Sequence, residues 1–559
     1  MIFFTGRGVR MLKKVLKKTA AAVMVAATML AAIASHDFVT DKAGAVAEAA
    51  GRPVSIDSCV IQGGNVVVNV SGSASASDGN YYLFADEVYQ DGTVGTIVAT
   101  TAAGKNATFT FPLGYNTAES NLSKKFLVAV KSGGSYVQVS DEHYITNPEG
   151  NAFKTTVRND HGIKGILPNE TNIATFKDLG VSQIVYNLYM GDIVVDPANV
   201  TVPVTPFEYN GVTYLFNTAA LNQYDGIVSW CKVGGLQLTM TILNNKTEAG
   251  ADLIHPLSRD SHVCPGYAMN TKEAAGTNHL KAIAAFLAQR YSGGAYGTID
   301  NWVIGNEVNA RTEWYYMSSS NLELNVSEYV KAFRIFYNEI KAVNGNARVF
   351  NSIDQEWQRK SNPGCSLSKD FLDRFNYYML REGNIDWGLS FHPYNAPLFD
   401  PYTWKQQSIY VSPNLSTPYI TMENLYVLTD YMCQPSFLNP AGQVRAISLS
   451  EIGFTSSFGE EYQAASVAYA YTVASTNPYI TSFMLFRETD NAHEMESHIA
   501  QGLKRLDGTR KPAYDYYRAM GTIEQESYKA QASAIIGADI NSLVANRTFL
   551  SRGGWELND

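Results

Sequence analysis

The sequence predicts an α/β protein, a (β/α)8 TIM barrel preceded by a small all-β sandwich domain. From about residue 155, short and nearly all-apolar runs alternate eight times with helical patterns. Strands of a parallel sheet, which are buried on both faces, have this composition. Before residue 147, short β-branched and aromatic runs are separated by turn clusters instead, a spacing typical of antiparallel sandwiches.

The predicted sandwich covers residues 54–146. Its strands are runs such as NVVVNVSG, ATFTFPL and KFLVAVKSG, and QGGN and SDGN are the turns between them. This domain could bind carbohydrate through Tyr81, Tyr82 and Tyr89, or it could only brace the barrel. The sequence leaves both roles open.

The predicted barrel covers residues 155–525, and each apolar run in it precedes a helical pattern. In order, the runs are GIKGIL, VSQIVYNLYM, LQLTMTILNN, IDNWVIGNE, ARVFNSID, IDWGLSFHPY, VRAISLSEIGF and ITSFMLFRE. Eight strand–helix pairs match a (β/α)8 barrel with long loops. An open doubly wound sheet is the alternative, but no glycine-rich phosphate loop follows any of the runs. Residues 526–559 are expected to form a C-terminal helical extension outside the barrel.

The N-terminus predicts export. A basic stretch with Lys13, Lys14, Lys17 and Lys18 precedes an apolar run of about 16 residues and several small-residue cleavage motifs, the pattern of a secretory signal peptide. A membrane anchor is the alternative, but a span needs about 20 apolar residues. We expect residues 1–50 to be a signal peptide with a pro-like segment, and the mature protein to be secreted or on the cell surface.

Charge and cysteine content narrow the class of partner. Removing residues 1–50 would remove seven basic and three acidic residues, which takes the formal charge from −9 to −13. Such an acidic chain is poorly suited to nucleic acid or an anionic membrane, and no later run is long enough to span a membrane. The five cysteines include no CxxC pair, so neither a metal site nor another cofactor is indicated. Oligomeric state is left open.

Polar residues end most of the predicted strands. In a barrel the carboxyl ends of the strands form the active face, so these residues are the candidate site. They are Asn187, Asn244, Asn306 with Glu307, His392 with Tyr394, Glu451, and Phe486 with Arg487.

Two of these residues are carboxylates on the fourth and seventh strands, roughly opposite each other across the barrel. Glu307 ends NWVIGNE and Glu451 ends AISLSE. Cleavage of a glycosidic bond needs such a pair, one acid held protonated to donate to the leaving oxygen and one ionised to attack carbon or to activate water. Like charge between two carboxylates helps to keep one of them protonated.

On these residues the barrel resembles the clan of retaining (β/α)8 glycoside hydrolases. The resemblance covers roughly residues 155–525 and includes His392-Pro393-Tyr394 and the ending DGTRKPAY. It implies that Glu307 is the acid/base and Glu451 the nucleophile, that Asn306 binds a sugar hydroxyl, and that Tyr394 hydrogen-bonds the nucleophile while His392 lines the subsite. It also implies a carbohydrate substrate. From their positions near strand ends, Asn187, Asn244, Phe486 and Arg487 are candidates for further substrate contacts.

The sequence departs from the clan in two places. Val308 stands where a proline commonly follows the acid/base, and Phe486 and Arg487 stand where the eighth strand commonly ends in tryptophan. Arg487 could face an acidic or sulfated sugar, or it could pair with Glu488. These departures keep a second hypothesis open, a catalytically silent barrel that binds glycan at the cell surface. An aldolase is disfavoured, because no lysine ends a predicted strand.

Overall fold

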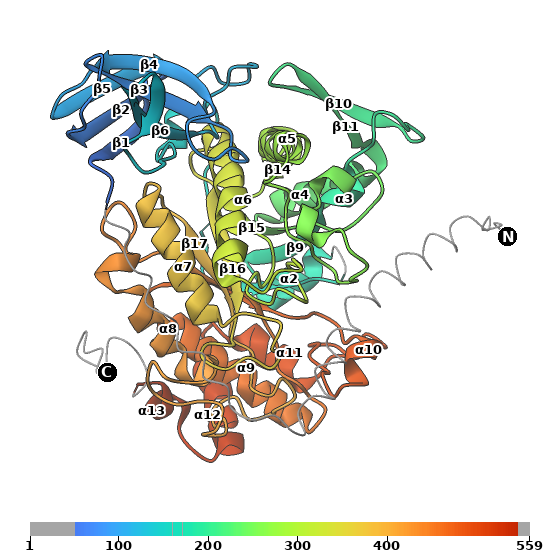
Figure 1. Cartoon of the computed structure of the whole chain (residues 1–559). Helices are drawn as coiled ribbons and strands as arrows, with labels where there is room; N and C mark the ends of the chain where they lie inside the picture. The colour runs from blue at the N-terminus through green and yellow to red at the C-terminus, as the bar shows by residue number, and fades with distance from the viewer. Residues whose placement is uncertain (1–50, 159, 170–171, 546–559) are drawn as a thin grey trace.

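A computed structural model describes residues 51–158, 160–169 and 172–545 (Figure 1). The expected signal segment, residues 1–50, and the last part of the expected C-terminal extension, residues 546–559, lie outside the described residues. In the described part, no helix combines the length and the apolar character needed to cross a membrane.

The first domain is a sandwich of two antiparallel sheets. Apolar residues of both sheets, such as Val68 and Val128, share one buried core. One sheet contains, in spatial order, β1 (Val54–Gln62), β2 (Asn65–Gly72) and β5 (Asn106–Pro112). The other contains β4 (Thr96–Ala102), β3 (Asn80–Asp86), β6 (Lys125–Ser132) and β7 (Ser135–Gln138).

The second domain is a closed barrel of eight parallel strands, which confirms the predicted fold class. The strands pair in chain order and the last closes on the first, as a (β/α)8 barrel requires. They are β8 (Lys164–Ile166), β9 (Gln183–Tyr189), β12 (Gln237–Leu243), β15 (Asn301–Ile304), β16 (Arg348–Asp354), β17 (Gly388–His392), β18 (Ile447–Ile452) and β19 (Ile480–Leu485).

Eight helices alternate with these strands. Several begin at an asparagine side chain that accepts hydrogen bonds from the first turn, as Asn217 does from Ala219 and Ala220. The helices are α2 (Ile173–Leu179), α4 (Thr218–Gly234), α5 (Ala274–Arg290), α6 (Leu322–Val343), α7 (Ser368–Arg381), α8 (Leu425–Met432), α9 (Glu460–Ser475) and α11 (Pro512–Ala519).

Shorter helices and strands lie in the loops and at the C-terminal end of the described chain. The long segment after β9, which we expected to be a loop, contains a hairpin of β10 (Val204–Tyr209) and β11 (Val212–Asn217), and its Phe216 ring stacks on Phe286 of α5. The remaining elements are α3 (Met190–Ile193), α10 (Ala492–Met495), α12 (Gln525–Ile536), α13 (Ile540–Ala545), β13 (Ser292–Gly293), β14 (Gly297–Thr298), η1 (Pro148–Asn151), η2 (Ala251–Leu253), η3 (Pro256–Ser258), η4 (Met422–Asn424) and η5 (Pro435–Phe437).

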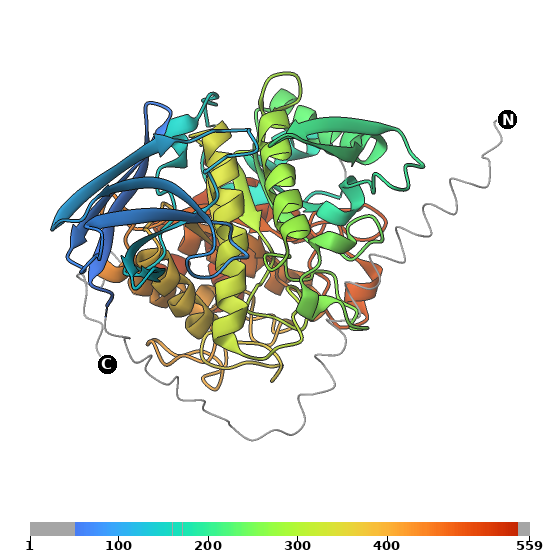
Figure 2. The same ribbon diagram turned by 45° about the horizontal axis from the view of Figure 1, so that its top comes forward.

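The sandwich packs against the helix layer of the barrel beside α6 (Figure 2). Buried polar contacts join them. For example, Asn338 of α6 donates to the Leu122 carbonyl at 3.0 Å, and Ser123 donates to Glu339 of α6 at 2.8 Å. Tyr81, one of the tyrosines considered for sugar binding, is buried in the sandwich core at 1% exposure. The contacts tie the sandwich to the helix that follows β15, the strand that leads to Glu307.

Candidate active site

We use "mouth" for the face of the barrel at the carboxyl ends of its strands. Glu307 reaches this face through a tight turn after β15. Gly305 has φ +79°, and a Cβ there would lie 2.7 Å from Val308 Cγ1, so only glycine suits the position. Glu307 itself has φ +40°, and its N–H donates to Ser352 Oγ at 3.1 Å. The turn therefore ends the apolar strand at Gly305 and presents the Glu307 carboxyl group at the mouth.

The Glu307 side chain is paired with a histidine from β17. His392 Nδ1 lies 2.7 Å from Glu307 Oε1, and its Nε2 lies 3.0 Å from Ser450 Oγ of β18. Both ring nitrogens therefore have partners, which sets the orientation of the ring. His392 does more than line a subsite, since it touches the candidate acid directly.

Burial raises the pKa of Glu307 from its ordinary value of 4.5 to about 7. The hydrogen bond with His392 and the charge of that ring oppose the shift, while the charges of Asp354 and Glu451 add to it. A carboxylic acid with this pKa keeps its proton over much of the neutral range and can still release it. These are the properties of a general acid.

Glu451 has a different environment. It lies on β18 where the pairing with β19 becomes irregular between Leu449 and Ile452, and its side chain is only partly buried. The Tyr394 hydroxyl donates to Glu451 Oε1 at 2.7 Å, the contact that the resemblance implies. This hydrogen bond orients the Glu451 carboxyl group at the mouth.

Two of the predicted asparagines are available to a ligand. Asn306 is 7% exposed, and the described residues offer its side chain no hydrogen-bond partner. Asn187 is exposed on β9. It lies on the same face of the strand as Gln183. Inside the barrel, the Gln183 side chain donates to the Thr481 carbonyl and accepts from Ser482. Asn187 therefore faces the barrel interior near the mouth.

The third predicted asparagine, Asn244, supports a loop. Its amide nitrogen donates to the carbonyls of Leu253 and Ala268 at 3.0 and 3.2 Å, and the residue is 2% exposed. The structure does not bring it into the group around Glu307, because these backbone acceptors hold its side chain.

The end of the eighth strand carries an ion pair. Arg487 Nη2 donates to Glu494 Oε1 of α10 at 2.9 Å, and the guanidinium lies 4.5 Å from the Phe486 ring centroid. Glu488, the partner we considered for Arg487, pairs with Lys504 at 2.7 Å. The sequence pattern did not point to Glu494, because it lies in the short helix α10 and not at the end of a predicted strand.

Two further acids after β16 support loops. Asp354 Oδ1 accepts from Ser368 Oγ at 2.6 Å and from the Glu356 N–H at 2.8 Å, and Glu356 accepts from Ser361. Ser352 contacts Glu307 and Ser450 contacts His392, and neither serine was predicted from the sequence. Each is a small residue inside an apolar strand, so its position in the sequence does not distinguish it.

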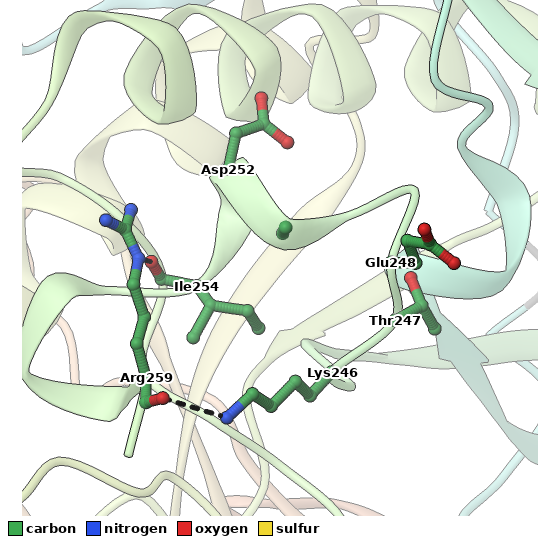
Figure 3. A pocket seen from close by; sticks show the side chains of 7 residues that line it. Lys246, Thr247, Glu248, Asp252, Ile254 and Arg259 are labelled. Atoms are coloured by element: carbon green, nitrogen blue, oxygen red, sulfur yellow. Dashed lines mark hydrogen bonds between the residues drawn. The ribbon is translucent and has the colours of Figure 1, made fainter. Parts of the chain in front are cut away.

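Outside the group around Glu307, a hollow of about 700 Å³ opens beside the loop after β12 (Figure 3). Lys246 crosses it and donates to the Arg259 carbonyl at 3.2 Å. Its lining residues are Lys246, Thr247, Glu248, Ala251, Asp252, Ile254 and Arg259, so it contains none of the predicted site residues. Among the residues that the structure describes, no cluster of three or more His, Cys, Asp or Glu side chains could hold a metal ion, and all five cysteines are buried and free of disulfides.

A family model, "Family of unknown function (DUF5722)", matches residues 156–543, the barrel and the helices that follow it. The chain belongs to the DUF5722 family. No curated protein gives a match to it.

Solved structures similar to this DUF5722 chain include a β-D-glucuronidase from Dictyoglomus thermophilum, with 10% identity over 83% of this chain and 68% of that chain and a TM-score of 0.34. A GH5_18 protein from Bifidobacterium longum subsp. longum has 12% identity over 64% and 78%, with a TM-score of 0.42. A hyperthermophilic β-glucosidase mutant has 15% identity over 62% and 86%, with a TM-score of 0.41.

Proposed function

We propose that this DUF5722 chain is a retaining glycoside hydrolase that cleaves O-glycosidic bonds of an oligo- or polysaccharide. The observation that carries the proposal is the contrast between two carboxyl groups at one mouth. Glu307 is buried against His392 with its pKa raised to about 7, while Glu451 is partly exposed and accepts a hydrogen bond from Tyr394. Environments that separate an acid from an anion are what this chemistry needs.

In the first step, Glu307 donates its proton to the glycosidic oxygen while a Glu451 carboxylate oxygen attacks the anomeric carbon. The bond from that carbon to the leaving oxygen breaks, the alcohol departs, and a glycosyl ester of Glu451 forms. The Tyr394 hydroxyl orients the attacking carboxylate, and Asn306 and Asn187 bind sugar hydroxyls.

In the second step, the Glu307 carboxylate removes a proton from water as the water oxygen attacks the anomeric carbon. The ester bond breaks, the sugar leaves with its original anomeric configuration, and Glu307 regains its proton. His392 holds the Glu307 side chain in place through both steps.

The test is hydrolysis of a panel of glycans by the wild type, Glu307→Gln and Glu451→Gln. We expect both variants to fold and to lose turnover, by a factor of at least about 10⁴ for Glu451→Gln. Glu496→Gln is the matched control, because Glu496 is an exposed acid whose carboxylate pairs with His493. NMR of the first product formed shows whether configuration is retained. Full activity in either active-site variant would refute the assignment.

The second hypothesis, a silent glycan-binding barrel, has its own outcome in this experiment. It is supported by saturable glycan binding with no turnover in the wild type and no change of affinity in Glu451→Gln. We also propose that residues 1–50 direct secretion or display at the cell surface, on the basis of their basic and apolar pattern. N-terminal sequencing of the exported protein would test this, and retention of Met1 or Met11 would contradict it.

A further inference from the structure

The ion pair between Arg487 and Glu494 is mostly buried. Their side chains are 15% and 10% exposed, so neither charge is screened well by water. Glu494 Oε2 is buried, and the described residues give it no hydrogen-bond partner, as is also true of Arg487 Nε. Each residue of the pair therefore keeps one buried polar atom whose hydrogen-bonding capacity is unsatisfied by the described residues.

The same pair lies beside Glu451. The Phe486 N–H donates to the Ile452 carbonyl at 2.6 Å, which joins the residue before Arg487 to the residue after Glu451. The burial that raises the pKa of Glu494 to about 7 is opposed by Arg487 and reinforced by the charge of Glu451. The pair is thus part of the wall next to the candidate nucleophile.

Acidic side chains gather in this part of the barrel. Glu307 follows the fourth strand, Asp354 ends the fifth, Glu451 lies on the seventh, and Glu494 follows the eighth. Among the described residues, His392 contacts Glu307 and Arg487 pairs with Glu494, so both basic side chains are already engaged. A ligand carboxylate entering here would meet acids and would have to displace Glu494 to reach Arg487.

We propose that the Glu494–Arg487 pair restricts the site to uncharged sugars and excludes uronic acids. This inference rests on the proposed function. Glu494 occupies the guanidinium that would otherwise bind a sugar carboxylate, and it adds negative charge next to Glu451. A protein can discriminate against a ligand by placing a like charge against it, and such a juxtaposition is costly. Glu494 is therefore a specificity-determining residue, not a catalytic one.

The test compares matched neutral and anionic probes on the full chain. The pairs are 4-nitrophenyl glucoside with glucuronide and galactoside with galacturonide, as both anomers, and mannan with polymannuronate. We expect the wild type to prefer the neutral member of a pair by at least about 100-fold in kcat/KM. In Glu494→Gln, which keeps the shape and removes the charge, we expect the ratio of anionic to neutral turnover to rise by about 10-fold or more.

Two further variants make the result unambiguous. In Arg487→Met/Glu494→Gln the guanidinium that would bind a sugar carboxylate is absent, so the gain seen in Glu494→Gln should disappear. Glu496→Gln should leave the ratio at the wild-type value. Circular dichroism confirms that each variant is folded. An equal or greater wild-type rate on the uronides, or a ratio that Glu494→Gln does not move, would overturn the inference. If the wild type cleaves no probe and no glycan of either kind, the proposed function itself fails.

Discussion

His392 Nδ1 lies 2.7 Å from Oε1 of Glu307, and the opposite ring nitrogen lies 3.0 Å from Ser450 Oγ. The contact joins the end of the fourth barrel strand to the end of the sixth. Burial works against protonation of His392, but the charges of Glu451 and Glu307 outweigh it and raise the pKa of the ring. The titrations of Glu307 and His392 therefore depend on each other.

The activity should fall as the pH rises above neutrality. Burial raises the pKa of Glu307 to about 7, so the acid form disappears above that value. The pH profile of kcat/KM on a natural glycan should show a basic limb near pH 7. With an aryl glycoside whose leaving group needs no proton, Glu307→Ala should lose that limb while retaining the first step. An unchanged limb in the variant would show that another group causes it.

The stability of the fold should respond to the same group. The folded pKa of Glu307 is above its ordinary value of 4.5, so the native state binds more protons than the unfolded chain between about pH 4.5 and 7. The contribution of Glu307 is therefore present below pH 4.5 and is lost as the pH rises through about 7. Glu307→Gln removes this loss and should gain about 1–3 kcal/mol relative to the wild type from about pH 4 to about pH 8. Urea unfolding at both pH values measures it, and Glu496→Gln should show no comparable gain.

Replacing His392 by asparagine should move the basic limb upward. The hydrogen bond and charge of His392 lower the pKa of Glu307 against the effect of burial, so their loss allows that pKa to rise. We also expect kcat to fall about 10-fold, because the Glu307 carboxyl loses its support. His161→Asn is the control, since His161 is exposed and precedes β8 at the opposite end of the barrel from the mouth. If kcat falls but the basic limb of the pH profile stays in place, His392 supports the packing of the site and does not set the pKa of Glu307.

Tyr394→Phe should slow catalysis and leave the fold intact. The hydroxyl donates to Glu451 Oε1 at 2.7 Å, and a hydrogen bond to a charged group is worth about 1.5–3 kcal/mol. We therefore expect kcat to fall about 10- to 100-fold with little change in KM. Tyr514→Phe is the matched control, because Tyr514 donates to Asp178 at 2.8 Å in the helix layer. Equal kinetic losses in the two variants would indicate a general structural effect.

Ser123→Ala should lower stability through the domain contact. Ser123 donates to the buried Glu339 of α6, so its removal leaves a buried acid short of a partner at a cost of about 1–3 kcal/mol. Ser77→Ala removes an exposed bond to the Lys131 carbonyl and should change stability by less than about 0.5 kcal/mol. Chemical denaturation of both variants measures the difference. A neutral Ser123→Ala would mean that the sandwich does not brace α6 through this bond.

Much of the barrel could be predicted because strands buried on both faces must be apolar or small along most of their length. β12, for example, is buried along its whole length, and its sequence QLTMTIL is correspondingly apolar or small. The positions of Glu307 and Glu451 followed, because a charged residue near the end of such an apolar run must lie at the carboxyl end of the strand. The β10–β11 hairpin could not be predicted with the same means, since its polar and aromatic alternation stabilises it only once Phe216 packs on α5.

By itself, then, the sequence determined the fold class, the order of the strands and which polar residues follow them. Only the tertiary structure decided the partners: His392 with Glu307, Tyr394 with Glu451, and Asn244 with the carbonyls of its own loop. The reason is physical. The periodicity of a sequence indicates whether a residue faces the core, and it depends on only a few neighbouring residues. These hydrogen bonds join residues that are distant in the sequence, so barrel closure and loop packing determine which residues become partners.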